Sequence, residues 1–332
     1  MSSRTTVLPL RIGALTGLHR AALSLAALTV GALLGPPSPA AGLQAAERPV
    51  LSRVAHVGLV VRDADRAASA WADTFDVPRT PLRTVSPERR RLAEVRFDNL
   101  VLEFSEPIGG ASPWRDFLTA HGEGIHHLAF EVPNLKDAGR ALKQFGGRQT
   151  SGTGRASALF DFDNRMGGAI ELVPAAADNP RNGRTPGTRT TIVALGHLTR
   201  DIEPARRFWG ELLAAPIPEA RDTKGVPFPA DCQCDREAYI REVNIRGLTP
   251  GLNLIQPMGG TSVWRHLIEQ HEGLAYLQFN LPDQASLDAM IASLLARGGV
   301  RTLGDTGAPY AYIDLQQTLG LTLLLVKSAP PR

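Results

Sequence analysis

The sequence predicts an α+β protein of two related domains, and three internal repeats lead to this fold class. Residues 107–121 (PIGGASPWRDFLTAH) recur as residues 257–271 (PMGGTSVWRHLIEQH), 150 positions later. Residues 159–173 (LFDFDNRMGGAIELV) match residues 312–326 (YIDLQQTLGLTLLLV), 153 positions later. Inside the first half, the segment HVGLVVRDADRA resembles HLAFEVPNLKDA, 71 positions later. Repeats of this kind indicate one structural unit that is used several times.

Each unit is expected to consist of a strand, a helix and three further strands. The first helix begins near Asp63, because apolar residues follow at helical spacing: Ala67, Ala70, Trp71 and Phe75. The corresponding residues of the second helix are Leu135, Ala138, Leu142 and Phe145. Strand-like runs follow each helix, namely LAEVRF and LVLEF, then ALFDF and AIELV. A β-α-β-β-β unit is therefore predicted twice per domain and four times in the chain.

The expected domains are residues 50–176 and 190–329, joined by a linker at residues 177–189. The linker is polar and rich in Pro, Gly and Asn. The chain has 332 residues, of which 43% are hydrophobic and 21% are charged. This length and composition allow two globular domains of ordinary size.

The N-terminal segment resembles a secretory signal peptide, which we assign to residues 1–40. Residues 21–34 (AALSLAALTVGALL) are apolar, follow Arg4, Arg11 and Arg20, and precede a stretch of small residues. This run is shorter than a typical bilayer span, although a membrane anchor is the alternative interpretation. Cleavage would remove the three arginines and cancel the formal net charge of +3. We therefore expect an exported protein, periplasmic or secreted, with no stable membrane span after cleavage.

The two cysteines of the chain, Cys232 and Cys234, form a C-x-C pair. A disulfide between them would close a small, strained ring, and structural zinc normally takes four ligands. We interpret the pair as a feature of a surface loop. The mature part has no basic block with interleaved aromatic residues, so we expect a small-molecule substrate and no nucleic-acid partner.

Strand alternation predicts a metal site on one face of the first domain. Successive residues of a strand point to opposite faces. In VAHVGLVV, LVLEFSE, GIHHLAFEV and AIELV, the large aliphatic residues share one face. The other face carries one candidate ligand per strand: His56, Glu103, His127 and Glu171. Two imidazoles and two carboxylates suit one divalent ion such as Ni, Co, Fe, Mn or Zn, and a six-coordinate ion would keep two positions for a substrate. By the same alternation, His126 is expected to face away.

These segments resemble the vicinal oxygen chelate superfamily, which includes glyoxalase I, methylmalonyl-CoA epimerase, extradiol dioxygenases and bleomycin or fosfomycin resistance proteins. The resemblance rests on VAHVGLVVRDADRA, VLEFSEP, HGEGIHHLAFEV and GGAIELV, and covers most of residues 53–175 and, more faintly, 192–328. It implies two tandem domains whose paired β-α-β-β-β modules curve around a metal-holding cleft, and it implies the same four ligands. The segment HGEGIHHLAFEV is closest to the epimerase branch, whereas the His, Glu, His, Glu set matches bacterial glyoxalase I.

The second domain is expected to have lost its metal and to serve a structural role. Its residues at the ligand positions are His197, Asn253, Tyr276 and Leu324. Leucine cannot bind a metal, and tyrosine and asparagine are poor substitutes for the original ligands. Three residues of the first domain, Trp114, Arg115 and His121, recur in this copy as Trp264, Arg265 and His271. We therefore assign them to packing and capping.

The run LAEVRF adds Glu94 and Arg96 on one strand face. The resemblance places Glu94 where the epimerase branch has a catalytic glutamate. We predict Glu94 and Glu171 as two bases on opposite sides of the substrate, with Arg96 holding an anionic group. The alternative for Glu94 and Arg96 is an exposed charged face of an edge strand.

The predicted function is metal-dependent proton transfer next to a carbonyl, by an isomerase, an epimerase or a glyoxalase-like lyase. One alternative is an extradiol-type dioxygenase, whose 2-His-1-carboxylate triad has three protein ligands instead of four. The other is a non-catalytic binding protein of the drug-resistance type, for which a metal has no evident use. Export disfavours CoA and glutathione thioesters, which are mainly cytoplasmic. The substrate and the oligomeric state stay open.

Overall fold

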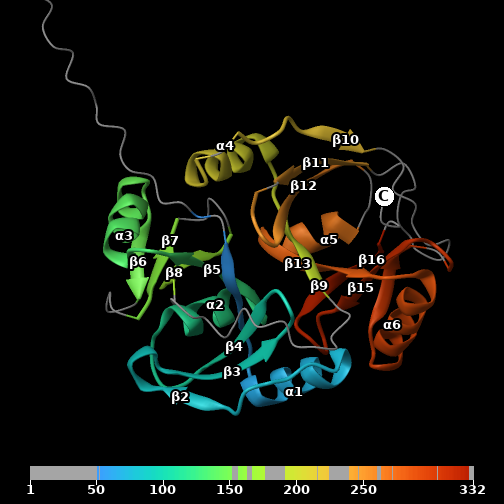
Figure 1. Cartoon of the computed structure of the whole chain (residues 1–332), viewed down its shortest axis with the longest axis horizontal. Coiled ribbons are helices and arrows are strands. Elements are labelled where there is room, and N and C mark those ends of the chain that lie inside the picture. Colours follow the sequence, from blue (N-terminus) through green and yellow to red (C-terminus); the bar gives the residue numbers. More distant parts are fainter. Residues whose placement is uncertain are drawn as a thin grey trace, which may run out of the picture. The chain divides into compact units, whose positions relative to one another are not determined.

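The computed structural model has two mixed β-sheets of eight strands each, both within one compact unit, Ala45–Arg332 (Figure 1). It describes residues 51, 53–151, 156–162, 167–175, 191–214, 216–223, 239–245, 247–259, 263–270, 272–304 and 306–328. The predicted signal peptide, the linker at residues 177–189 and both cysteines lie outside the described residues. The predicted α+β class with two tandem sheet domains is confirmed. Among the described residues, no helix has the length and hydropathy that a membrane span requires.

The first sheet has the strand order β2-β3-β4-β1-β5-β8-β7-β6. Its first module contains β1 (Val54–Val60), α1 (Ala64–Phe75), β2 (Arg83–Val85), the short 3-10 helix η1 (Ser86–Glu88), β3 (Arg90–Arg96) and β4 (Val101–Pro107). Its second module contains β5 (Gly124–Val132), α3 (Leu135–Gln144), β6 (Arg148–Ser151), β7 (Ala158–Asp161) and β8 (Ala169–Pro174). The modules join where β1 and β5 pair antiparallel. Both therefore follow the predicted β-α-β-β-β order.

The second sheet repeats this arrangement in the order β10-β11-β12-β9-β13-β16-β15-β14. Its first module contains β9 (Thr191–Leu198), α4 (Ile202–Leu212), β10 (Arg221–Thr223), β11 (Tyr239–Ile245) and β12 (Gly251–Gly259). Its second module contains β13 (Gly273–Leu281), α6 (Gln284–Ala296), β14 (Val300–Leu303), β15 (Tyr310–Leu315) and β16 (Leu321–Lys327). Each sheet is thus built from two copies of one unit.

One face of each sheet, called the outer face here, packs against the module helices. Helix α1 begins after Asp63, whose side chain accepts a hydrogen bond from the backbone N–H of Arg66 and so caps the helix. The buried side chains of α1 include Trp71 and Phe75. The outer faces of both sheets share one hydrophobic core, in which the ring of Phe75 stacks on Phe279 of β13 at 4.9 Å. The helices therefore leave the opposite face of each sheet, called the inner face here, for other contacts.

An additional helix, which the sequence pattern does not predict, packs on each inner face. These helices are α2 (Pro113–His121) and α5 (Val263–Gln270); Figure 1 shows α5 within the curve of the second sheet. Trp114 of α2 is buried against Val60, Leu159 and Ala169 of the first sheet. As predicted for a packing residue, the equivalent Trp264 is buried in the second sheet. Helix α2 therefore covers the face on which the predicted ligands lie.

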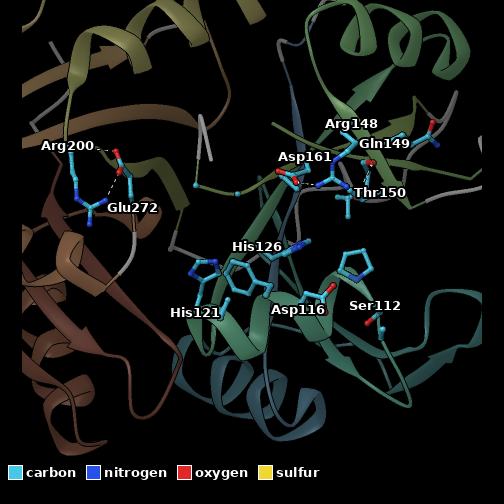
Figure 2. A pocket seen from close by; sticks show the side chains of 18 residues that line it. Ser112, Asp116, His121, His126, Arg148, Gln149, Thr150, Asp161, Arg200 and Glu272 are labelled. Atoms are coloured by element: carbon cyan, nitrogen blue, oxygen red, sulfur yellow. Dashed lines mark hydrogen bonds and ion pairs between the residues drawn. The ribbon is translucent and has the colours of Figure 1, made fainter. Parts of the chain in front are cut away.

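A cavity of about 1000 Å³ lies between α2 and strands β6 to β8 (Figure 2). Its lining includes Asp116 and Phe117 of α2, Asp161 of β7 and His126 of β5. An ion pair between Arg200 and Glu272 contributes to its lining from the second domain. None of the four predicted metal ligands lines this cavity.

Candidate metal centre

Four central strands bring the predicted ligands to the inner face of the first sheet. Gly58 of β1 lies opposite Glu103 of β4 on one side and opposite His127 of β5 on the other. Glu171 of β8 lies opposite Ala129, two residues beyond His127. Paired residues of neighbouring strands share a face, and His56 shares that of Gly58 because it lies two residues earlier. The period of the strands therefore places all four side chains together.

Gly58 provides the space that the imidazole of His127 occupies. A Cβ atom on Gly58 would lie 1.8 Å from Cε1 of His127, which no contact between heavy atoms allows. The second sheet has the same arrangement, because a Cβ on Gly196 would lie 1.8 Å from Cε1 of Tyr276. A ring over a glycine is therefore a shared feature of both sheets.

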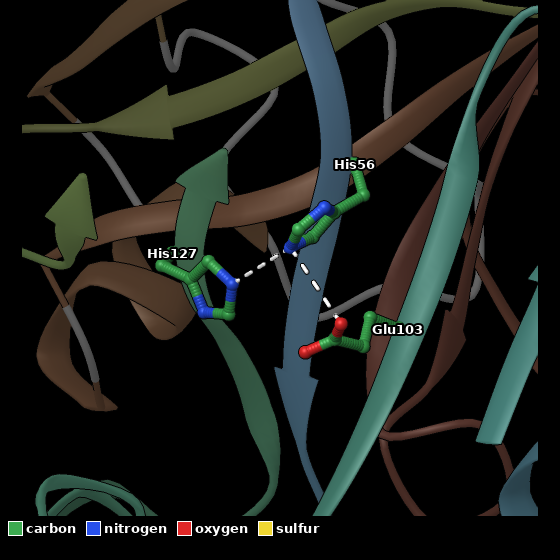
Figure 3. A group of neighbouring side chains, drawn as sticks. All are labelled: His56, Glu103 and His127. Carbon is green, nitrogen blue, oxygen red and sulfur yellow. Dashed lines mark hydrogen bonds and ion pairs between the residues drawn. The ribbon is translucent and has the colours of Figure 1, made fainter. Parts of the chain in front are cut away.

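The four side chains form a buried cluster, of which Figure 3 shows His56, Glu103 and His127. Donor atoms of His56, Glu103 and His127 all lie within 4.8 Å of one another. Nε2 of His56 is 3.8 Å from Oε2 of Glu103 and 3.0 Å from Oε2 of Glu171. The most exposed of the four residues is Glu103, at 6%. The cluster is thus almost entirely buried.

Three of these donor atoms have the spacing of ligands to a single ion. Nε2 of His56 is 3.2 Å from Nε2 of His127, and Oε2 of Glu171 is 3.0 and 3.2 Å from these two nitrogens. Ligand atoms at right angles on bonds of about 2.1 Å lie about 3.0 Å apart. Among the described residues, Oε2 of Glu171 has no hydrogen-bond partner of acceptable geometry, although it is buried. A buried carboxylate oxygen near two imidazole nitrogens, without such a partner, fits a divalent cation.

Arg90 of β3 is a member of this cluster that the sequence analysis missed. Its Nη1 donates hydrogen bonds to Oε1 of Glu103 and to Oγ of Ser105, the latter at 2.5 Å. Its Nε donates to Oε2 of Glu88 at 2.6 Å, and the guanidinium lies 4.3 Å from the centre of the Trp114 ring. Arg90 therefore holds Glu103 through Oε1 and leaves Oε2 on the side of His56.

The charges of the cluster shift the ionisation of its members. Burial by itself would raise the pKa of Glu103, but Arg90 and His56 outweigh it and lower this pKa to about 2. Burial likewise opposes ionisation of Glu171, while its close contacts with His127 and His56 bring its pKa well below the usual range. Both carboxylates are therefore ionised at neutral pH, as ligands of a cation need to be.

Glu94 and Arg96 lie on the same inner face, beside the cluster. Glu94 pairs directly with Glu103 across β3 and β4, and it is 4% exposed. Its carboxylate lies 2.7 Å from Nη2 of Arg96 and 3.6 Å from Nη2 of Arg83. The edge strand is β2, not β3. The alternative interpretation of Glu94 as part of an exposed edge is therefore wrong.

His126 does not face away from the cluster, contrary to the expectation from strand alternation. Gly58 pairs with His127 but the next residue, Leu59, pairs with Ile125. His126 is therefore the extra residue of a β-bulge, which interrupts the alternation. Its Nδ1 lies 3.0 Å from Nδ1 of His127. The extra residue of a β-bulge cannot be predicted from the alternation of side chains in that strand alone.

The assignment of His197 as the counterpart of His56 is also wrong. Gly196 pairs with Asn253 and Tyr276, as Gly58 pairs with Glu103 and His127. The residue two positions before Gly196 is Ala194, which therefore occupies the position of His56. His197 lies on the outer face, where its Nδ1 accepts a hydrogen bond from the indole of Trp209 in α4 at 3.3 Å.

The inner face of the second sheet contains a cluster of mostly apolar side chains. Tyr276 and Leu324 occupy the positions of His127 and Glu171, as expected, and join a buried cluster with Trp264 of α5. Ile240 belongs to the same cluster and occupies the position of Arg90. The register shows this, because Asn244 pairs with Asn253 as Glu94 pairs with Glu103. Ile240 lies four residues before Asn244, as Arg90 lies four residues before Glu94. The ligand set of the first sheet thus has no equivalent among the described residues of the second.

Comparisons with known proteins agree with this architecture. Residues 55–162 match the family model of the Glyoxalase/Bleomycin resistance protein/Dioxygenase superfamily. The mitochondrial methylmalonyl-CoA epimerase of Mus musculus is 28% identical over 95 residues, which are 28% of this chain and 53% of that protein. The ethylmalonyl-CoA/methylmalonyl-CoA epimerase of Cereibacter sphaeroides is 27% identical over 100 residues, 30% of this chain and 75% of that protein. The chain thus spans about half the length of one relative and three quarters of the other.

A solved structure extends the likeness to both sheets. A mutant of 4-hydroxymandelate synthase from Streptomyces coelicolor superposes with a TM-score of 0.58 over 86% of this chain and 94% of that chain. The identity is 16%, so this likeness concerns the fold alone. Together with the family match over most of the first sheet, it confirms the resemblance on which the sequence analysis relied. Residues 55–162, most of the first domain, thus match the glyoxalase/bleomycin resistance protein/dioxygenase superfamily, and the fold of both sheets is similar to that of 4-hydroxymandelate synthase.

Proposed function

We propose that this protein is a divalent-metal-dependent enzyme that transfers a proton next to the carbonyl group of a small molecule, as an isomerase, an epimerase or a glyoxalase-like lyase. The observation that carries the proposal is the triangle of Nε2 of His56, Nε2 of His127 and Oε2 of Glu171, with edges of 3.0 to 3.2 Å. The sequence match to two proteins named as epimerases favours proton transfer among the reactions of the superfamily.

The residues proposed to hold the ion, which is Ni, Co, Fe, Mn or Zn, are His56, Glu103, His127 and Glu171. When bound, such an ion polarises a carbonyl oxygen and makes the neighbouring proton easier to remove. The carboxylates of Glu103, Glu171 and Glu88 face a single buried guanidinium, that of Arg90. The resulting excess of negative charge favours binding of a dication.

Glu94 is the residue proposed to accept the proton. It pairs with Glu103 across the two strands, so its carboxylate lies beside the ligand set and not within it. The ion pairs with Arg96 and Arg83 hold this carboxylate in place, and Arg96 is exposed enough to attract an anionic part of a substrate as well. Glu171 would act as the second base, from the β8 side of the cluster.

A dioxygenase is the second candidate, and one observation favours it. Arg90 binds Glu103, whereas Glu171 is nearer to both histidines. If Glu103 served only as the partner of Arg90, then His56, His127 and Glu171 would form a 2-His-1-carboxylate triad. The two reactions differ in their need for oxygen, which makes them separable by experiment.

The test is hydrogen exchange under argon. Protein freed of metal by EDTA and reloaded with each candidate ion would be incubated in D2O with a panel of 2-oxo acids, hydroxyketones and malonate half-thioesters. Loss of the proton signal next to the carbonyl would be followed by NMR. We expect exchange with at least one ion and one substrate class, without oxygen. Oxygen consumption by the reloaded protein, with no exchange under argon, would overturn the proposal in favour of the dioxygenase.

We also propose that the protein is exported, which rests on the composition of residues 1–40. The mature chain should begin between Ala40 and Glu47. Fractionation of the producing cells followed by N-terminal sequencing tests this proposal. An intact Met1 on protein from the cytoplasmic fraction would contradict it.

A further inference from the structure

We propose that His126 is a positioning residue for the metal ligand His127, because its Nδ1 accepts a hydrogen bond from Nδ1–H of that ring. This hydrogen bond would fix the tautomer and the orientation of His127. The inference rests on the proposed metal site and adds to it a residue outside the predicted ligand set.

The bulge in β5 is what brings the two rings together. His126 is the extra residue between the pairs Gly58–His127 and Leu59–Ile125. In a regular strand, adjacent side chains point to opposite faces. At this bulge, the rings of His126 and His127 are instead perpendicular neighbours, with their centres 5.2 Å apart.

The atoms in contact determine the direction of the hydrogen bond. Nε2 of His127 faces His56 and Glu171, and Nδ1 of the same ring lies 3.0 Å from Nδ1 of His126. A neutral imidazole that binds a cation through Nε2 carries its proton on Nδ1 and donates there. Nδ1 of His126 must then be the acceptor, so the proton of His126 is on its Nε2.

Aromatic side chains of helix α2 hold the ring of His126 in place. The ring lies 4.7 Å from that of Trp114 and 5.0 Å from that of Phe117, centre to centre. These two rings hold His126 in the orientation that places its Nδ1 beside Nδ1 of His127.

The second sheet has no equivalent of His126 beside Tyr276, the residue that replaces the proposed ligand His127. The bulge recurs there, because Gly196 pairs with Tyr276 and the next residue, His197, pairs with Leu274. The extra residue is Ala275, which packs against the apolar cluster. Trp264, the equivalent of Trp114, is buried in this cluster although an alanine occupies the position of His126. Burial of the tryptophan therefore does not require a histidine at this position.

Three substitutions separate hydrogen bonding from packing. His126→Asn carries an acceptor oxygen on Cγ, where histidine carries Nδ1. His126→Gln has the same amide one bond further out, and His126→Leu fills space without an acceptor. Affinity for Zn²⁺ and Co²⁺ would be measured for each by competition with a chromophoric chelator. Thermal unfolding of the metal-free proteins would show whether each variant folds.

We expect His126→Asn to bind these ions within about threefold of the unsubstituted protein. His126→Gln and His126→Leu should bind about 10 to 100 times more weakly, which is the usual loss when a ligand loses its hydrogen-bonding partner. A packing role predicts the reverse order, with leucine nearest to the original affinity, and that result would overturn the inference. If the unsubstituted protein binds neither ion, the proposed function fails together with it.

Discussion

The inner faces of the two sheets have the same scaffold but different side chains at the positions of the predicted ligands. Each has a glycine under an aromatic or imidazole ring, a bulge beside that ring, and a covering helix with a buried tryptophan. In the first sheet the enclosed space holds imidazoles, carboxylates and a guanidinium. In the second, the residues at equivalent positions are Ala194, Ile240, Asn253, Tyr276 and Leu324.

This difference indicates which residues serve the fold and which serve a site. Buried ionic groups contribute little to stability compared with well-packed apolar side chains of similar volume. The second sheet shows that this fold forms without the two histidines, the two glutamates and the arginine at these positions. The buried polar set of the first sheet, Arg90 and His126 included, is therefore best explained by a function.

The largest loss of metal affinity is expected when a ligand of the first sheet is replaced by the equivalent residue of the second. His127→Tyr replaces a ligand by the side chain that fits over glycine in the other sheet. Loss of a partner of a ligand weakens metal binding 10- to 100-fold, so loss of the ligand itself should cost about 100-fold or more. Chelator competition measures this loss. The control is Tyr276→Phe, which should leave affinity unchanged, and equal losses in both variants would contradict the comparison.

Glu94→Gln should separate catalysis from metal binding. The second sheet has Asn244 at this position, and an amide cannot accept a proton at neutral pH. Proton exchange should fall by about 100-fold or more while the metal content stays the same. Glu171→Gln should reduce both, since that residue is proposed to bind and to act. Full exchange activity of Glu94→Gln with metal bound would exclude the two-base account.

Alanine at the two equivalent glycines tests the shared scaffold. Gly58→Ala and Gly196→Ala each place a Cβ 1.8 Å from a ring atom. Overpacking of this kind costs about 1 to 3 kcal/mol of the free energy of unfolding, and we expect both metal-free variants to lose stability in urea denaturation. Only Gly58→Ala should also weaken metal binding, because it displaces His127. Weaker metal binding in Gly196→Ala would mean that the second domain affects the metal affinity of the first.

The smallest expected effect is an opposite pH dependence of stability in the metal-free protein. The pKa of Glu103 is lowered from 4.5 to about 2, so its contribution is present above pH 4.5 and is lost as the pH falls towards 2. Burial raises the pKa of Tyr276 from 10.0 to about 12, so its contribution is present below pH 10 and is lost as the pH rises towards 12.

Denaturation curves of Glu103→Gln and Tyr276→Phe against pH measure these two contributions. Each variant should flatten its own limb of the stability profile and leave the other limb unchanged. A flattened acid limb in Tyr276→Phe would show that the two inner faces have been assigned the wrong titrating groups.

The strand period was sufficient to predict the four-residue cluster. In each of these strands, large apolar side chains occupy one face and the predicted ligand lies on the other. The repeats likewise predicted the order of the elements in each module. Both kinds of inference use local sequence and the symmetry of the chain. These inferences are correct where the strand has no bulge and where the two repeats align without an insertion or deletion.

The errors arise where non-local structure decides. Arg90 stands between Arg89 and Arg91, a run that is typical of a solvated surface, and only the pairing of β3 with β4 shows that one of the three is buried. The bulge at His126 adds a residue that alternation does not register. His197 was matched to His56 by residue type, whereas the pairing around Gly196 determines the true position.

X-ray absorption spectroscopy of the metal-loaded protein tests the central claim most directly. Zinc bonds of about 2.0 to 2.1 Å to nitrogen or oxygen are distinct from bonds of about 2.3 Å to sulfur. The account predicts one ion per chain, a shell of nitrogen and oxygen atoms with the scattering of two imidazoles, and loss of one imidazole in His127→Tyr. A shell that contains sulfur, or an unchanged spectrum in His127→Tyr, would show that the ion is bound elsewhere and would contradict the assignment of the first inner face.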